Sequence, residues 1–106
     1  MTDFMGLMKQ AAALKSKMDA MQAELESAEV EGTAGGGLVR VTLSGKGEMK
    51  GVRIDDSLMK PTEKEIVQDL IVAACADARR KAEALLQEKV KAVTGGLPLP
   101  PGMSSF

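Results

Sequence analysis

Residues 30–55 read VEGTAGGGLVRVTLSGKGEMKGVRID, and this stretch decides the fold class. Apolar side chains recur at every second position in residues 39–44 (VRVTLS) and again in residues 51–55 (GVRID). Alternation with a period of two is typical of strands that are buried on one face. The glycines at residues 45–47 predict a tight hairpin between these two strands. A third strand around residues 28–34 completes a small three-stranded antiparallel β-meander.

The glycine cluster at residues 35–37 allows two interpretations, a phosphate-binding loop or a structural part of the sheet. A phosphate-binding loop opens directly into a helix, whose first N–H groups hold the anion. Here the glycines lead into a strand, and the pair Gly45 and Lys46 is followed by Gly47 instead of Ser or Thr. We therefore expect no nucleotide site. Gly32 and the cluster are expected to allow a turn, a bulge or the close approach of another backbone.

A long amphipathic helix is predicted for residues 4–28. Apolar residues follow a 4,3 spacing there, and the segment has no Pro and no Gly after Gly6. The spacing predicts a narrow seam like that of a coiled coil. The seam consists of Phe4, Leu7, Ala11, Leu14, Met18, Met21, Leu25 and Ala28.

A second long helix is predicted from near Glu63 to about Val93. Pro61 blocks an earlier start, and Thr62 with Glu65 has the spacing of a capping box. The glycines at residues 95–96 predict its end. The predicted fold is therefore α+β, in the order long N-terminal helix, three-stranded antiparallel β-meander and long C-terminal helix.

The chain is expected to form one dimerising domain, residues 1–94, followed by a Pro/Gly-rich tail, residues 95–106. A helix of about 25 residues spans roughly 37 Å, whereas a strand of about seven residues spans roughly 23 Å. The helices must therefore project beyond the sheet. A projecting apolar seam and a small sheet with open edges both need a partner, which a symmetric homodimer supplies. The tail is either a polyproline ligand or, as we favour, packs along its own dimer.

The composition argues against catalysis. The chain has no His, Trp or Tyr, and its one Cys is Cys75. Histidine-based acid–base catalysis, the usual zinc ligand sets and Cys–His pairs are thereby excluded. We expect no enzymatic activity, no cofactor, no metal and no small-molecule substrate. The N-terminus has neither a basic leader nor a sustained apolar run, so we expect a cytoplasmic protein with no membrane association.

Charges are segregated along both predicted helices, although the totals of 14 basic and 15 acidic residues nearly cancel. The first helix has lysines in its first half and acids in its second half, against the helix dipole, and the second helix has the reverse order. If the helices pack antiparallel, the two basic halves meet away from the sheet. Such an arrangement suits the phosphate backbone of double-stranded DNA. The candidate DNA-binding residues are Lys9, Lys15, Lys17, Arg79, Arg80, Lys81, Lys89 and Lys91.

Three segments together resemble the YbaB/EbfC family of bacterial nucleoid-associated proteins. They are GLMKQAAALKSKMDAMQAEL (6–25), VEGTAGGGLVRVTLSGKGEMKGVRID (30–55) and TGGLPLPPGM (94–103), so the resemblance covers essentially the whole chain. It implies a homodimer with a small sheet body and projecting helices. It also implies binding of duplex DNA with low or modest sequence selectivity, in the nucleoid, with a role in nucleoid organisation or gene regulation.

Two other functions fit parts of the sequence. Met8, Met18 and Met21 could make the first helix an adaptor for a partner helix, because Met-rich surfaces accept several partners. We favour the interpretation in which these residues fill a dimer core. Residues 4–21 also have the amphipathic pattern of a membrane-surface helix. The absence of Trp and the acidic second half of the helix argue against that function.

Overall fold

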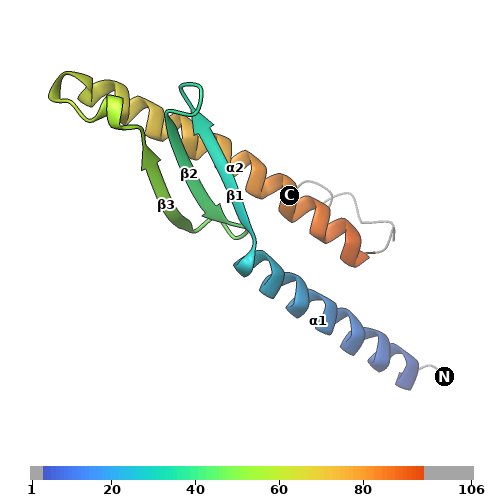
Figure 1. Ribbon diagram of the computed structural model, residues 1–106. Coiled ribbons are helices and arrows are strands. Elements are labelled where there is room, and N and C mark those ends of the chain that lie inside the picture. The colour runs from blue at the N-terminus through green and yellow to red at the C-terminus, as the bar shows by residue number, and fades with distance from the viewer. Residues whose placement is uncertain (1–3, 95–106) are drawn as a thin grey trace.

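The computed structural model describes residues 4–94 and shows an α+β fold, which confirms the predicted fold class. A three-stranded antiparallel sheet lies against one long helix, and the other long helix leads into the sheet and projects beyond it (Figure 1). The elements are α1 (Phe4–Ser27), β1 (Glu29–Ala34), β2 (Val39–Ser44), β3 (Met49–Ile54) and α2 (Lys64–Thr94). Short 3-10 turns, Asp56–Leu58 and Pro61–Glu63, join β3 to α2. The predicted tail, residues 95–106, lies outside the described residues.

The strands follow the order β1-β2-β3, as expected for a meander. Val41 of β2 is the partner of Gly32 in β1 and of Val52 in β3. A bulge between Thr42 and Leu43 shifts the register at one end of the β2–β3 ladder. The period-two pattern puts the apolar residues of all three strands on the face that looks toward α2.

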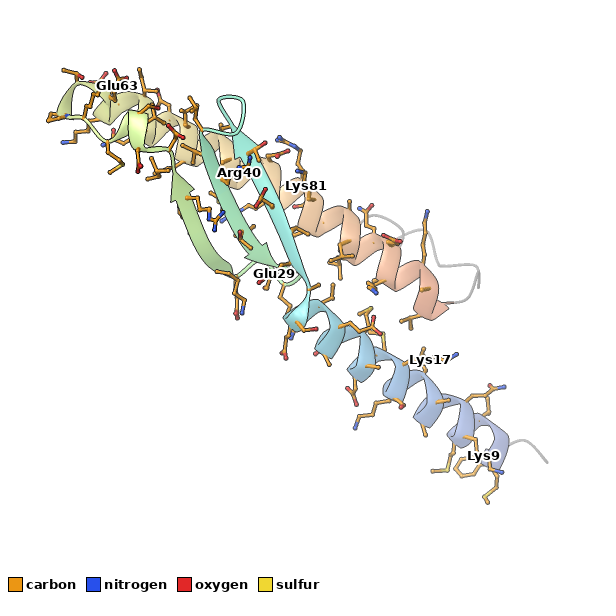
Figure 2. All side chains as sticks on the ribbon, viewed as in Figure 1. Lys9, Lys17, Glu29, Arg40, Glu63 and Lys81 are labelled. Atoms are coloured by element: carbon orange, nitrogen blue, oxygen red, sulfur yellow. The ribbon has the colours of Figure 1, made fainter. Side chains whose placement is uncertain are left out.

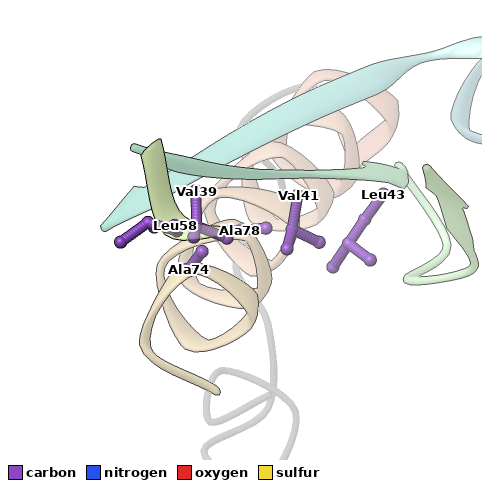
Figure 3. Packing of buried hydrophobic residues seen from close by; sticks show 6 residues of the cluster. All are labelled: Val39, Val41, Leu43, Leu58, Ala74 and Ala78. Atoms are coloured by element: carbon purple, nitrogen blue, oxygen red, sulfur yellow. The ribbon is translucent and has the colours of Figure 1, made fainter. Parts of the chain in front are cut away.

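The core forms where α2 crosses β1 and β2. Val39, Val41 and Leu43 of β2 are fully buried against α2 (Figure 3). The helix contributes Ala74 and Ala78, which are also fully buried, and these small side chains allow its backbone to approach the sheet closely. Leu58 of the first 3-10 turn completes this buried cluster, and larger residues of α2, such as Leu70 and Ile71, pack against it half-buried.

Gly32 makes this close approach possible. A Cβ atom at this position would overlap with the carbonyl oxygen of Ala74 and the amide nitrogen of Ala78. The neighbouring glycines serve the β1–β2 turn, where Gly35, Gly36 and Gly37 adopt φ values of 65°, 69° and 94°. Left-handed backbone of this kind favours glycine. The structural interpretation of the glycine-rich stretch is therefore confirmed.

The end of α1 packs into the body of the protein, whereas the rest of the helix does not. Met21 and Leu25 are buried, and Gly45 of the hairpin leaves room for the backbone of Leu25. All residues from 4 to 20 are exposed. The first helix therefore projects from the sheet, as predicted.

The predicted capping box at the start of the second helix is wrong. Residues Pro61–Glu63 form a 3-10 turn that runs directly into α2, so Thr62 lies inside this turn and not at a helix N-cap. Its side chain makes no hydrogen bond within residues 4–94. The proline still sets the place where the helix begins, because its fixed φ suits the first turn.

Gly32→Ala tests the close approach of the helix. The added methyl group collides with backbone atoms of α2, and overpacking of this kind costs about 1–3 kcal/mol or more. We expect a clearly lower urea midpoint by far-UV circular dichroism at fixed protein concentration. Gly51→Ala is the control, because a Cβ there meets no atom within 4 Å. Equal midpoints for the two variants would contradict this role of Gly32.

Candidate nucleic-acid interface

Lys9, Lys15 and Lys17 lie on the projecting part of α1, residues 4–20, which we call the arm. The arm is exposed along its whole length, and Figure 2 shows Lys9 and Lys17 away from the sheet. Within residues 4–94 none of the three lysines has an ion-pair or hydrogen-bond partner. Three unpaired ammonium groups are therefore available to an anionic ligand.

The apolar seam of the arm is also open to solvent. Phe4 is 69% exposed, Leu7 is 62% exposed and Leu14 is 49% exposed, although the same seam is buried farther along at Leu25. A second uncovered apolar region lies on β3, where Met49 is 53% exposed and Val52 is 40% exposed. Both sets of exposed apolar side chains follow one side of their element, as surfaces that contact a partner often do.

Lys81 holds α2 against the edge of the sheet. Its Nζ donates a hydrogen bond of 2.7 Å to the carbonyl oxygen of Glu31 and lies 3.3 Å from Oδ2 of Asp77. The same Asp77 oxygen accepts a hydrogen bond of 3.0 Å from the backbone N–H of Thr33. Asp77 and Lys81 thus satisfy outward-facing backbone groups of β1, which protects this edge strand from pairing with other strands.

The pKa of Asp77 is lowered from its ordinary value of 3.8. The hydrogen bond from Thr33 is the main cause, and Lys81 and Arg80 contribute further by stabilising the carboxylate. Arg80 itself is mostly exposed and approaches Asp77 only to 3.5 Å. Of these two cations, Arg80 is the one that can turn toward a ligand without giving up a close contact.

Lys89 joins the two helices. Its Nζ lies 2.9 Å from Oε2 of Glu24, and this carboxylate raises the pKa of Lys89. The basic end of α2 therefore lies against the acidic half of α1, and not against its basic half as expected. The reason is that the first part of α2 crosses the sheet, whereas α1 packs against the body of the protein only at its C-terminal end. Lys17 is two helical turns from Glu24, roughly 10 Å along the axis.

The remaining predicted cations lie elsewhere on α2. Arg79 lines an open groove of about 680 Å³ together with Met21, Leu25 and Leu86, between the end of α1, the β2–β3 hairpin and α2. Arg79 makes no ion pair within residues 4–94. Lys91 is in the last turn of α2. The eight predicted residues thus do not form one patch.

Two further cations, Arg40 and Arg53, were not among the predicted residues. They lie on the sheet face that is turned away from α2, and the register makes them direct partners on adjacent strands. The alternation of the strands could have placed them on this face, because each is flanked by apolar residues that point to the core.

Residues 1–97 match the sequence model of the YbaB/EbfC DNA-binding family. The chain belongs to this family. The resemblance seen in the sequence is thereby confirmed, and it extends over all of the described fold.

Relatives in this family carry the name nucleoid-associated protein. One from Rhodopseudomonas palustris (strain BisB5) is 64% identical over 103 residues, which is 97% of each chain. Another from Nitrobacter hamburgensis is 62% identical over the same length, also 97% of each chain. A crystal structure of an uncharacterized protein from Helicobacter pylori has the same fold, with a TM-score of 0.69 and 25% identity over 91% of this chain and 98% of that one.

Within the described part of the chain, neither helix combines the length and apolarity that a membrane span requires. Residues 4–94 also contain no cluster of three or more His, Cys, Asp or Glu side chains arranged to hold a metal ion.

Asp77→Asn tests the contact between α2 and β1. Because the folded pKa lies below 3.8, the carboxylate adds stability above that pH, and this stability disappears as the pH falls through the folded pKa. We expect a lower urea midpoint than wild type at pH 7 and a smaller difference at pH 3. Asp69→Asn, an exposed position on the same helix, is the control. If the urea midpoints of Asp77→Asn and wild type differ by the same amount at both pH values, the Asp77 carboxylate does not stabilise the contact between α2 and β1.

Proposed function

We propose that the protein binds double-stranded DNA as a homodimer, mainly through phosphate contacts, and that it serves nucleoid organisation or gene regulation. The observation that carries this proposal is the arm of α1, on which three lysines have no partner within the described residues. Membership in a DNA-binding family supports DNA as the polyanion. The relatives named nucleoid-associated proteins support the wider role.

The uncovered apolar surfaces support the homodimer. The arm exposes Phe4, Leu7 and Leu14 along one line, and β3 exposes Met49 and Val52 on the core side of the sheet. A second copy of the chain offers the same surfaces in return, as a twofold axis requires. Burial of these side chains on dimerisation removes apolar area from water, which stabilises the dimer by about 25 cal/mol for each Å² buried. The seam of the arm therefore faces the partner, and the lysines beside it face solvent.

The spacing of the arm lysines suits a DNA backbone. Lys9 and Lys17 are separated by roughly 12 Å along the helix axis, and Lys15 lies between them. Lysine binds phosphates as a point charge through a long flexible stem, which needs no particular base sequence. In a dimer two such arms present these charges to one duplex. With only two aromatic residues in the chain, both Phe, stacking on single-stranded bases has little support.

The eight candidate cations have different roles in this proposal. Lys9, Lys15, Lys17 and Arg79 contact phosphates, and Arg80 and Lys91 add to the positive field. Lys81 and Lys89 act chiefly within the protein, because each holds an intramolecular carboxylate or carbonyl group. The nearly neutral net charge makes the binding local and sensitive to salt.

Lys9→Gln/Lys17→Gln tests the arm as the DNA-binding surface. The double variant removes two phosphate-binding cations per protomer, and each phosphate that is no longer neutralised reduces the slope of log K against log salt by about 0.9. We expect an affinity at least about tenfold weaker for a random duplex, measured by fluorescence anisotropy from about 50 to 200 mM salt. The charge-matched control is Lys60→Gln/Lys64→Gln, at exposed positions outside the arm.

Equal reductions of affinity in both double variants would contradict the arm as the contact surface. A wild-type protein that binds no duplex even at low salt would instead favour the adaptor function, for which the exposed Met8 and Met18 of the arm provide a surface. In that case a partner protein should co-purify with the chain after nuclease treatment.

A further inference from the structure

The sheet has a second face that no helix covers within the described residues. Val39, Val41 and Leu43 point toward α2, so the residues between them point the opposite way. This outer sheet face presents Arg40 and Thr42 of β2 together with the residues aligned with them on β1 and β3. On β3 these are Arg53, opposite Arg40, and Gly51, opposite Thr42.

Arg40 and Arg53 stand directly opposite each other on adjacent antiparallel strands. Side chains at such positions have their Cβ atoms about 4.5–5.5 Å apart, and like charges there destabilise the sheet. Glu31 offsets one of the charges, since its Oε1 lies 3.3 Å from Arg40. Arg53 has no ion pair or hydrogen bond of its side chain within residues 4–94. The pair is thus incompletely neutralised in the isolated chain.

The surroundings of the pair are open and shallow. Arg40 and Arg53 line a hollow of about 650 Å³ beside the β1–β2 turn, and the Nε of Arg40 donates to the carbonyl oxygen of Gly37 at 3.4 Å. In the next row of the sheet, where Gly51 lies opposite Thr42, a Cβ atom added to Gly51 would meet no other atom within 4 Å. The row next to the two arginines therefore has no side chain on β3 that would obstruct a ligand.

Two acids, Asp55 and Asp56, line the same hollow. Asp55 accepts hydrogen bonds from both the backbone N–H and the hydroxyl of Ser57, which lower its pKa. The hollow as a whole is therefore not strongly positive. An anion held here depends on the directed N–H groups of the two guanidinium groups, which match phosphate oxygens as paired donors.

We propose that Arg40 and Arg53 form a second DNA-binding surface, in which the two guanidinium groups hold backbone phosphate on the outer sheet face. This inference rests on the proposed DNA-binding function and adds a contact surface to it. The pair lies at the end of the sheet next to the β1–β2 turn, whereas the arm leaves from the opposite end of β1 (Figure 1). Each protomer therefore binds duplex DNA at two separate surfaces, the arm and the outer sheet face.

The test compares Arg53 variants in the salt-titrated binding experiment with a random duplex. Arg53→Gln removes one charge and a guanidinium group that has no partner within the described residues, and it relieves the repulsion with Arg40, so its urea midpoint does not fall below the wild-type value. We expect an affinity about three- to tenfold weaker and a salt slope lower by about 0.9 for each phosphate that is no longer neutralised. Arg53→Lys keeps the charge but not the paired donors, so its affinity for the duplex should lie between that of the wild type and that of Arg53→Gln.

Lys60→Gln is the matched control, since it removes one charge from an exposed position outside the arm and the outer sheet face. Arg53→Gln that keeps the affinity and slope of a DNA-binding wild type would overturn this inference and leave the proposed function intact. If Lys60→Gln weakens binding as much as Arg53→Gln does, this inference is also overturned and the proposed function stays intact, because the loss of affinity then follows from the total charge of the protein. A wild type that binds no duplex overturns both.

Discussion

The contact between Gly32 and the backbone of α2 at Ala74 and Ala78 is the constraint on which the rest of the structure depends. Because no side chain separates strand and helix there, α2 lies close over β1 and β2 and buries Val39 and Val41. The same proximity brings Asp77 and Lys81 within hydrogen-bond distance of the edge of β1. One strand edge is thereby closed by side chains of the helix.

The position of α2 also determines what stays uncovered. A single helix that packs mainly on β1 and β2 leaves the apolar side of β3 exposed, and it leaves room for only the last turns of α1. The arm and its seam consequently extend into solvent, and the molecule reaches 73 Å along its longest axis. An isolated protomer of this shape has too much apolar surface for its small core. A second copy that covers this surface would double the arm lysines at the same time.

Much of the fold could be predicted from the sequence because the local patterns agree with the tertiary contacts. The alternation at residues 39–43 predicted the buried face of β2, and the glycines predicted a turn and a close backbone approach. The start of α2 was predicted at nearly the right place for the wrong reason, since Thr62 lies in a 3-10 turn and caps nothing. A capping pattern alone cannot tell these two geometries apart.

The candidate site was harder to predict, because the role of a cation depends on partners far away in the chain. Lys81 binds the backbone of Glu31, and Lys89 pairs with Glu24, so neither role follows from local sequence. The length of the first helix predicted that it projects beyond the sheet, and its lysines are exposed there, but the meeting of the two basic halves that the charge order predicted is wrong. The Arg40–Arg53 pair required the register of the β2–β3 ladder, which the bulge between Thr42 and Leu43 makes irregular.

The most direct test of this account is the mass of the wild-type protein in solution, measured by sedimentation equilibrium at micromolar concentration without DNA. The chain has a mass of 11.2 kDa, and we expect a species of twice that mass. Its dissociation should be promoted by a charge in the seam, as in Leu14→Glu, and not by one on the solvent side of the arm, as in Ser16→Glu. A monodisperse wild-type monomer would contradict the claim that a second copy covers the exposed apolar surfaces.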